Sequence, residues 1–273
     1  MAKRRSEDNP ATVGDKVGGL IKELLIVVVG ALIIAALIRA FVGQMFLIPS
    51  GSMEHTLDIN DRIAVQKITH FRRGDVVVFK DPDHWLGAEP AAPERGPVGQ
   101  ALEFIGVLPD TSTEHLVKRV IGMPGDHVKC CDTRGRITVN GQPLNETSYL
   151  YSADGQQNAP SDIRFDVVVP RDRIWVMGDH RDDSADSRCH LADETSNGKG
   201  MGAFVPEDDV VGPVFAVVAP FSRAKLLHRP ATFDEVPAAK SPPPAEPVIR
   251  TPNVQALLIS IRWGSITKKN TDK

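Results

Sequence analysis

The stretch Phe46-Leu47-Ile48-Pro49-Ser50-Gly51-Ser52-Met53 decides how this chain folds, because it stands between a long apolar run and a body rich in strand patterns. Pro49 disfavours a helix at the residue before it, so the chain leaves the apolar run extended. Gly51 then permits a sharp turn that holds Ser52 in a defined place, with the Ser50 hydroxyl nearby. Ser52 is either a cap at a strand-to-helix turn or a nucleophile, and a nucleophilic serine needs a base.

Length and composition favour one sizeable β-rich domain. The chain has 273 residues, enough for a domain of about 150–200 residues plus tails. Glycine (22) and proline (21) are plentiful, and prolonged helical periodicity occurs only near the N-terminus, which favours a mainly β fold. A net charge of −3 gives no support for nucleic-acid binding.

The three cysteines are too few for a disulfide scaffold. Cys130 and Cys131 are adjacent, and Cys189 stands apart from them. We expect buried or free thiols at all three positions. A disulfide remains open if the domain faces an oxidising compartment.

The apolar run over residues 24–38 is a candidate membrane anchor because it has no polar side chain. As a helix it spans only about 22 Å, short of a hydrocarbon core of about 30 Å. Extension to Leu20 and Val42 reaches the needed length, with Lys22 and Arg39 reaching toward the two interfaces. We therefore expect an N-terminal transmembrane helix.

The predicted anchor covers residues 24–45 and follows a cytoplasmic tail over residues 1–23. The basic cluster at residues 3–5 places the N-terminus in the cytoplasm and everything after Arg39 outside. A cleaved signal peptide is the main alternative. Against cleavage, no convincing small-x-small site lies between the apolar run and Ser52.

Strand patterns begin near residue 61 and continue to residue 218. Alternation, β-branched residues and turn signals, including the hairpin turn Asn140-Gly141, carry this prediction. The expected strands lie within residues 62–68, 74–79, 114–123, 136–139, 167–169, 174–177 and 210–218. Residues 81–113 are expected to form a long, poorly ordered surface loop, and residues 229–273 a Pro-rich, mobile C-terminal tail.

Lys118 is the candidate base for Ser52. A strand through this region would place Leu116, Lys118 and Val120 on one face. The ordinary interpretation of such a residue is an exposed lysine at a sheet edge. A lysine between apolar neighbours is instead desolvated, which lowers its pKa from about 10.4 and lets the neutral amine accept a proton.

Several familiar catalytic patterns are missing from the sequence. It has no H-E-x-x-H, C-x-x-C or G-x-S-x-G motif and no phosphate-binding glycine loop, so we predict no metal and no cofactor. Ser222-Arg-Ala-Lys225 matches the S-x-x-K element of penicillin-binding proteins, but the accompanying S-D-N and K-T-G elements are absent. The polar run over residues 178–188, by itself, indicates a solvated loop.

Three blocks together resemble bacterial type I signal peptidases (leader peptidases), a family with a Ser/Lys dyad. They are Pro49-Ser-Gly-Ser-Met53, Lys118-Arg-Val-Ile-Gly-Met-Pro-Gly-Asp126 and Gly178-Asp-His-Arg-Asp-Asp-Ser-Ala-Asp-Ser-Arg188. They stand in the family's order, with Gly74-Asp-Val-Val77 between the first two, and the resemblance covers about residues 40–220. The adjacent cysteines and the long loop before Lys118 are similar to actinobacterial members.

The resemblance implies a role for each matching residue. Ser52 would be the nucleophile, Lys118 the general base, and Ser50 an oxyanion donor beside the Ser52 N–H. Ser184 would orient the lysine amine. The residues that would brace this loop are Asp186, Arg188, Asp179 and Arg181. The positions that would line shallow pockets for small substrate side chains are Phe46, Ile48, Pro49, Met53, Leu57 and Val117. His180 and Asp183 depart from the asparagines common in the family, as do Cys189-His190 and an insertion before Gly202.

The resemblance also implies a function and a location. The chain would be a single-pass plasma-membrane serine endopeptidase that removes N-terminal signal peptides from exported preproteins after small-x-small (Ala-x-Ala-like) sites. Its extracytoplasmic β-rich peptidase domain would span residues 46–228, with a signal-peptidase-like fold. Implied partners are preprotein signal peptides, the lipid bilayer and the secretion translocon, with no nucleic acid.

Two alternatives remain open at this point. One is a membrane-tethered Ser/Lys protease that cuts itself or a single partner. The other is a non-enzymatic β-domain displayed on the membrane, in which Ser52 and Lys118 never meet.

Overall fold

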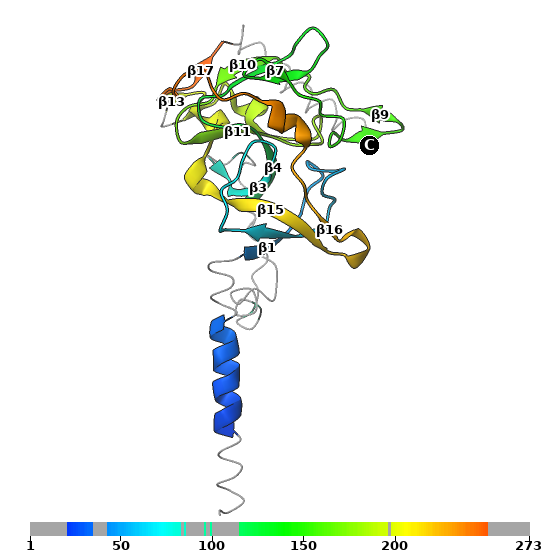
Figure 1. Cartoon of the computed structure of the whole chain (residues 1–273), viewed down its shortest axis with the longest axis vertical. Coiled ribbons are helices and arrows are strands. Elements are labelled where there is room, and N and C mark those ends of the chain that lie inside the picture. The colour runs from blue at the N-terminus through cyan, green and yellow to red at the C-terminus, as the bar shows by residue number, and fades with distance from the viewer. Residues whose placement is uncertain are drawn as a thin grey trace, which may run out of the picture.

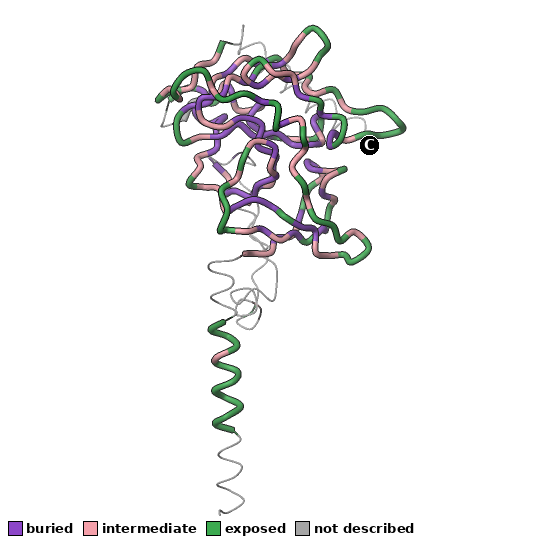
Figure 2. The backbone as a smooth tube through the Cα atoms, in the orientation of Figure 1, coloured by how far each residue is buried: buried purple, intermediate pink, exposed green. Residues whose placement is uncertain are grey.

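The computed structural model describes residues 21–34, 43–82, 115–195 and 198–250, with residues 85, 96 and 99 between them. Residues 21–34 form a helix, drawn in blue in Figure 1. The rest of the described chain is a mainly β body, as predicted. Figure 2 shows the helix exposed at all but one position, whereas the buried segments gather in the body.

The predicted anchor over residues 24–45 is only partly described. Residues 35–42 lie outside the described residues, and within the described ones no helix has the length and apolar character needed to cross a membrane. The C-terminal limit of the prediction is wrong, because Gly43–Leu47 form strand β1. Residues 43–47 pair with strand β2 instead of continuing the helix. The β body therefore begins at residue 43, three residues before the predicted start of the domain at residue 46.

The larger sheet has eight antiparallel strands in the described part of the chain. Its order is β1-β2-β15-β3-β4-β11-β14, and β16 pairs with β15. The strands are β1, β2 (Arg62–Gln66), β15 (Val210–Ala219), β3 (Val76–Lys80), β4 (His115–Gly122), β11 (Arg173–Met177), β14 (Val205–Pro206) and β16 (Lys225–Leu226). The central strand β3 is buried at four successive positions, as its unbroken apolar run predicts.

Strand β15 lets this sheet bend because its pairing is interrupted by register shifts. The shifts fall between Val210 and Gly212 toward β3, and between Val214 and Ala216 and between Val217 and Ala219 toward β2. Such bulges increase the local twist of a sheet. Gly212 has a φ of +153°, and a side chain there would collide with the carbonyl oxygen of Gln66. The bend brings the edge strand β1 back toward β4, where the Phe46 and His115 rings lie 5.1 Å apart.

The second sheet has five antiparallel strands in the described chain, in the order β17-β10-β5-β6-β7. They are β17 (Val248–Ile249), β10 (Phe165–Val168), β5 (His127–Cys130), β6 (Ile137–Val139) and β7 (Gln142–Pro143). The predicted hairpin turn Asn140-Gly141 joins β6 to β7, with positive φ at both residues. All seven predicted strand regions contain a strand.

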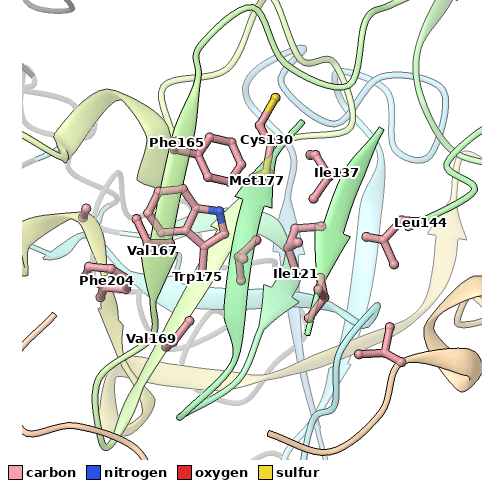
Figure 3. Close-up of a cluster of buried hydrophobic side chains, with 14 of the residues drawn as sticks. Ile121, Cys130, Ile137, Leu144, Phe165, Val167, Val169, Trp175, Met177 and Phe204 are labelled. Atoms are coloured by element: carbon pink, nitrogen blue, oxygen red, sulfur yellow. The ribbon is translucent and has the colours of Figure 1, made fainter. Parts of the chain in front are cut away.

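The largest apolar core lies between the two sheets and includes Trp175 from β11 and Phe165 from β10, with their ring centroids 5.1 Å apart. Figure 3 shows the Trp175 ring between Phe165, Val167 and Phe204. The remaining elements are short. They are the hairpins β8 (Ser152–Ala153) with β9 (Gln156–Gln157) and β12 (Glu194–Thr195) with β13 (Gly198–Lys199), and the 3-10 helices η2 (Ser187–His190), η3 (Met201–Ala203), η4 (Glu207–Asp209), η5 (Phe221–Arg223) and η6 (Ala231–Glu235).

The prediction of a mobile tail from residue 229 is wrong for residues 229–250, which pack along the body as the C-terminal segment. Phe233 in η6 is buried in the largest core. Farther along, β17 adds an edge strand to β10. The Pro-rich composition sets an extended course without preventing packing, because two apolar side chains, Phe233 and Val236, anchor it. Residues 251–273, and nearly all of the predicted loop over residues 81–113, lie outside the described residues.

The cysteines differ from the expectation of three free thiols. Cys130 and Cys131 form a disulfide with each other at the end of β5, whereas Cys189 is free. This disulfide is the alternative that the sequence left open.

Candidate active site

Ser52 lies on a turn held by its own backbone. The Ile48 N–H donates to the Asp61 carbonyl oxygen at 2.9 Å, so the chain stays extended past the end of β1. The Glu54 N–H then donates to the Gly51 carbonyl oxygen at 2.9 Å, and the Leu57 N–H to that of Met53 at 2.8 Å. The turn therefore places Ser52 rigidly, as Pro49 and Gly51 predict.

The structure brings Ser52 and Lys118 together. The Nζ of Lys118 lies 2.5 Å from the Oγ of Ser52, and the two residues are 3% and 8% exposed. Lys118 lies on β4, where pairing with β3 places it opposite Val77. Leu116 and Val120 on the same face are also buried, as the alternation predicts. The exposed edge lysine is thus ruled out, and so is a β-domain in which the two residues never meet.

Burial changes the proton affinity of the Lys118 amine. Desolvation lowers its pKa from 10.5 to about 8, although the nearby Asp186 carboxylate opposes this by favouring the ammonium form. Roughly a tenth of the amine is then neutral at pH 7 and about half at pH 8, whereas an exposed lysine would be almost entirely protonated. A neutral amine at hydrogen-bond distance from a hydroxyl can accept its proton.

The loop over residues 178–188 is braced by the Asp186–Arg188 pair. The Arg188 Nε and Nη2 donate to the Asp186 carboxylate, each at 2.8 Å. The Gly178 N–H and the Ser184 hydroxyl donate to the same carboxylate at 2.9 and 2.8 Å. Burial alone would raise the pKa of Asp186, but the Arg188 guanidinium outweighs it and holds that pKa at about 2. The ion-paired residues of this run are therefore buried, whereas Asp182, Asp183 and Ala185 are exposed as expected for a solvated loop.

A second set of ion pairs fixes the start of this loop. Arg119, next to Lys118 on β4, donates from Nε and Nη2 to the Asp179 carboxylate at 2.8 and 2.6 Å. The Thr56 hydroxyl, four residues after Ser52, donates to the same carboxylate at 2.5 Å. Arg181 pairs with the buried Glu146 at 2.5 Å. Asp179 thus joins the Ser52 turn, the strand that carries Lys118 and the polar loop.

The residues predicted to support the site lie in and around this loop. The partner of one of them, Ser184, differs from the prediction that it orients the Lys118 amine. Asp179, Arg181, Asp186 and Arg188 all form buried ion pairs around the loop. The Ser184 hydroxyl donates to Asp186, which itself influences the Lys118 amine. Ser50 is exposed beside the Ser52 turn.

The predicted pocket residues gather in one apolar cluster, most of which is closed. Phe46, Ile48, Met53 and Leu57 are each at most 3% exposed and pack together. Val117 packs against this cluster and is half-buried, while Pro49 is exposed. In the described chain, Pro49 and Val117 are the members of this set with accessible surface.

Other candidate chemistry fares less well. Ser222 and Lys225, from the S-x-x-K match, are both exposed, in η5 and β16. Among the described residues, no group of three or more histidine, cysteine, aspartate or glutamate side chains could hold a metal ion.

Sequence reasoning missed Arg119, Glu146 and the contacts of His180. Arg119 stands beside Lys118, and its guanidinium also lies 4.3 Å from the Tyr149 ring centroid. Glu146 is 4% exposed in a loop without any motif, so only its distant partner Arg181 reveals its role. Because a charged residue is costly to bury without a partner, an arginine inside an apolar strand was a usable signal for Arg119.

Comparisons with known proteins point to one family. The family model described as "Signal peptidase, peptidase S26" matches residues 21–219. A probable signal peptidase I of Mycobacterium leprae is 37% identical, covering 74% of this chain and 77% of its own. A signal peptidase I of Mycobacterium tuberculosis is 35% identical, covering 74% of each chain, and one of Leptolyngbya laminosa is 31% identical, covering 85% of this chain and 91% of its own.

A solved signal peptidase I from Enterococcus faecalis V583 aligns over 54% of this chain and 97% of its own, with 20% identity and a TM-score of 0.29, too low to support an inference. The sequence matches establish the family without this structural comparison. The match to the family model spans the Ser52 turn, the Lys118 strand and the braced loop, and two of the relatives are mycobacterial, in agreement with the actinobacterial features noted in the sequence. This chain belongs to the signal peptidase family, peptidase S26.

Proposed function

We propose that this chain is a membrane-anchored serine endopeptidase that removes N-terminal signal peptides from exported preproteins, with Ser52 as nucleophile and Lys118 as general base. The observation that carries the proposal is the buried contact of 2.5 Å between the Lys118 Nζ and the Ser52 Oγ in a member of the signal peptidase family. The relatives are named signal peptidase I, which supports preproteins as substrates.

The first half of the reaction forms an acyl-enzyme. The neutral Lys118 amine accepts the Ser52 proton as Oγ attacks the scissile carbonyl carbon. The Ser52 N–H and the Ser50 hydroxyl donate to the resulting oxyanion. The Lys118 ammonium then gives its proton to the leaving amine, which is the new N-terminus of the mature protein. Ser52 keeps the signal peptide as an ester.

The second half returns the enzyme to its starting state. Lys118 takes a proton from a water molecule that attacks the ester, and the same oxyanion donors act again. The Ser52 oxygen leaves and recovers the proton from Lys118. Asp186 and the residues that brace it keep the amine in place through both halves.

The proposed specificity is for small side chains on either side of one variable residue, an Ala-x-Ala-like site. The cluster formed by Phe46, Ile48, Met53 and Leu57 is buried, with Pro49 and Val117 at its surface, and this closed packing supports a preference for small groups. Larger side chains would have to displace a well-packed core, which is unfavourable.

The proposed topology is a single membrane pass with a cytoplasmic N-terminus and an extracytoplasmic catalytic domain. Along the helix over residues 21–34, apolar side chains such as Leu24, Leu25 and Val27 are 58–67% exposed. Exposed apolar surface of this kind has an unfavourable free energy in water and a favourable one in lipid. The basic residues at positions 3–5 support a cytoplasmic N-terminus. Such an anchor would hold the site near the bilayer, where a preprotein emerges from a translocon, its proposed neighbour.

The test is cleavage of a purified preprotein by the full chain in detergent. We expect wild type to cut after a small-x-small site, and Ser52→Ala and Lys118→Ala to be inactive while keeping the wild-type circular dichroism spectrum. Ser222→Ala and Lys225→Ala are matched controls, because the same pair of residue types lies exposed elsewhere, and both should stay active. An active Lys118→Ala variant would refute the dyad. If wild type leaves several preproteins intact but cuts its own chain, the self-processing alternative replaces this proposal.

A further inference from the structure

His180 contacts the nucleophile turn through both its backbone and its ring. Its N–H donates to the carbonyl oxygen of Ser52 at 3.1 Å. Its Nδ1 lies 3.2 Å from the carbonyl oxygen of Gly51. The ring is largely buried, with 13% of the side chain exposed. One residue therefore reaches the carbonyl groups of both peptides that flank Ser52.

The ring itself is held on three sides. Its Nδ1 lies 3.1 Å from the Glu54 Oε2, and its Nε2 lies 3.2 Å from the Asp182 Oδ1. The Tyr151 ring stacks on it with a centroid distance of 3.8 Å. Because the Gly51 carbonyl oxygen and the Glu54 carboxylate can only accept hydrogen bonds, either contact with Nδ1 requires a hydrogen on that nitrogen.

Holding the Gly51 carbonyl oxygen also aims the Ser52 N–H. The Gly51 carbonyl and the Ser52 N–H belong to one planar peptide unit, and in a trans peptide they point in opposite directions. Any rotation of this plane moves both groups together. The His180 ring opposes that rotation from the carbonyl side, and Glu54 supports it because its side chain lies across Gly51, so close that a Cβ there would be 3.0 Å from Oε1.

We propose that His180 is a positioning residue that fixes the peptide planes on both sides of Ser52 and thereby aims the Ser52 N–H at the oxyanion, with Glu54 holding the ring. This inference rests on the proposed function of Ser52. It assigns a task to a residue at which this chain departs from the family's usual asparagine.

The kinetic test separates positioning from folding. Removal of a whole oxyanion donor costs about 100-fold to 1,000-fold in kcat, so a misaimed one in His180→Ala should cost about 10-fold to 100-fold. KM should change little, because ground-state binding does not use this donor. His180→Asn places an amide N–H near the position of Nδ1 and should restore kcat to within about threefold of wild type. Glu54→Gln should lower kcat less than His180→Ala does.

His127→Ala is the matched control. His127 also pairs with a carboxylate, Asp166, at 2.7 Å, but it lies on β5 in the second sheet. Its loss should leave kcat within about twofold of wild type, as expected for a surface change away from the site. Unchanged kcat in His180→Ala would overturn the proposal. So would equal losses in His180→Ala and His180→Asn, because a role in packing alone does not depend on the N–H donor.

A second measurement does not depend on catalysis. The NMR spectrum of the full-length Ser52→Ala chain in detergent, with its histidines labelled with ¹⁵N, should show a protonated Nδ1 at His180. The His180 resonance is assigned because it disappears when His180→Asn is added to the Ser52→Ala chain. Glu54→Gln should shift this resonance and leave that of His127 in place. If wild type cleaves no preprotein, the proposed function fails while this spectrum still tests the contact. An unprotonated Nδ1 would overturn the proposal even in an active enzyme.

Discussion

The Nζ of Lys118 lies 2.5 Å from the Oγ of Ser52, although the two residues are 66 positions apart in the sequence. Ser52 follows the edge strand β1, and Lys118 lies on β4, with three strands between them in the sheet order. Their contact exists because the bulged strand β15 bends the sheet until β1 meets β4. The geometry of the Ser52–Lys118 contact is therefore a property of the whole larger sheet.

The pH dependence of cleavage should report the Lys118 amine. Burial lowers its pKa to about 8, and only the neutral form accepts the Ser52 proton. We expect kcat/KM to rise with pH, with a midpoint near 8, since below this pH the amine is already protonated. Cleavage of a short small-x-small peptide from pH 5 to pH 10 would measure it. A midpoint near 10.5, the ordinary value, would contradict the desolvated base.

The same burial predicts that the base destabilises the fold. Lys118 loses its proton at about pH 8 in the folded chain but at 10.5 when unfolded, so the unfolded chain binds more protons between these values and stability rises with pH there. Below pH 8 the folded chain carries a buried ammonium at a cost of roughly 3 kcal/mol. Lys118→Met should therefore be more stable than wild type at pH 7 by up to about 3 kcal/mol, and the gain should shrink toward zero above pH 10.

Denaturant unfolding of wild type and Lys118→Met, at pH 7 and again above pH 10, would measure the difference in their free energies of unfolding. Lys129→Met is the matched control, because this lysine lies half-exposed on β5, and its loss should change stability by no more than about 0.5 kcal/mol. A Lys118→Met variant less stable than wild type at pH 7 would show that the contacts of the amine outweigh its desolvation.

The strands could be predicted because their signals are local. The alternation around Lys118 and the run Val76–Phe79 depend only on neighbouring residues, and both regions are strands in the structure. The alternation by itself makes a desolvated Lys118 a candidate base, whereas the role predicted for the loop after Gly178 depends on family motifs and not on spacing. The sequence does not say that β1 meets β4, since that depends on bulges far away in β15.

What escaped prediction depends on long-range partners. Glu146 and Arg181 are 35 positions apart and pair only because two loops meet. The C-terminal segment has a composition typical of a mobile chain. The Phe233 ring nevertheless packs so closely against Gly74 that a Cβ on this glycine would lie 2.5 Å from it. Composition reports the mean tendency of a segment, whereas one buried aromatic side chain can decide where it lies.

Gly178 should not tolerate a side chain. A Cβ at this position would lie 2.5 Å from the carbonyl oxygen of Ser52 and would collide with the side chain of Ser184. Gly178→Ala should therefore push the nucleophile turn away from the braced loop. Because a displacement of about 1 Å can cost 100-fold in rate, we expect kcat to fall by about 100-fold. Preprotein cleavage under saturating substrate would measure it.

Gly30→Ala is the control for this substitution, because a Cβ on that helical glycine meets nothing within 4 Å. It should leave cleavage unchanged. Circular dichroism of both variants checks that the fold persists. A Gly178→Ala enzyme with wild-type kcat would mean that the Ser52 turn and the loop can separate without loss of catalysis.

The C-terminal segment should contribute to stability through Phe233. This side chain is 3% exposed, and its ring lies 6.1 Å from that of Tyr149, which in turn lies under the Arg119 guanidinium. Phe233→Ala leaves a cavity in the core, which typically costs about 3–5 kcal/mol. Phe221→Ala removes an equally large ring that is 92% exposed and should cost no more than about 0.5 kcal/mol. Denaturant unfolding of the two variants compares them directly, and equal midpoints would mean that residues 229–250 do not hold to the body in solution.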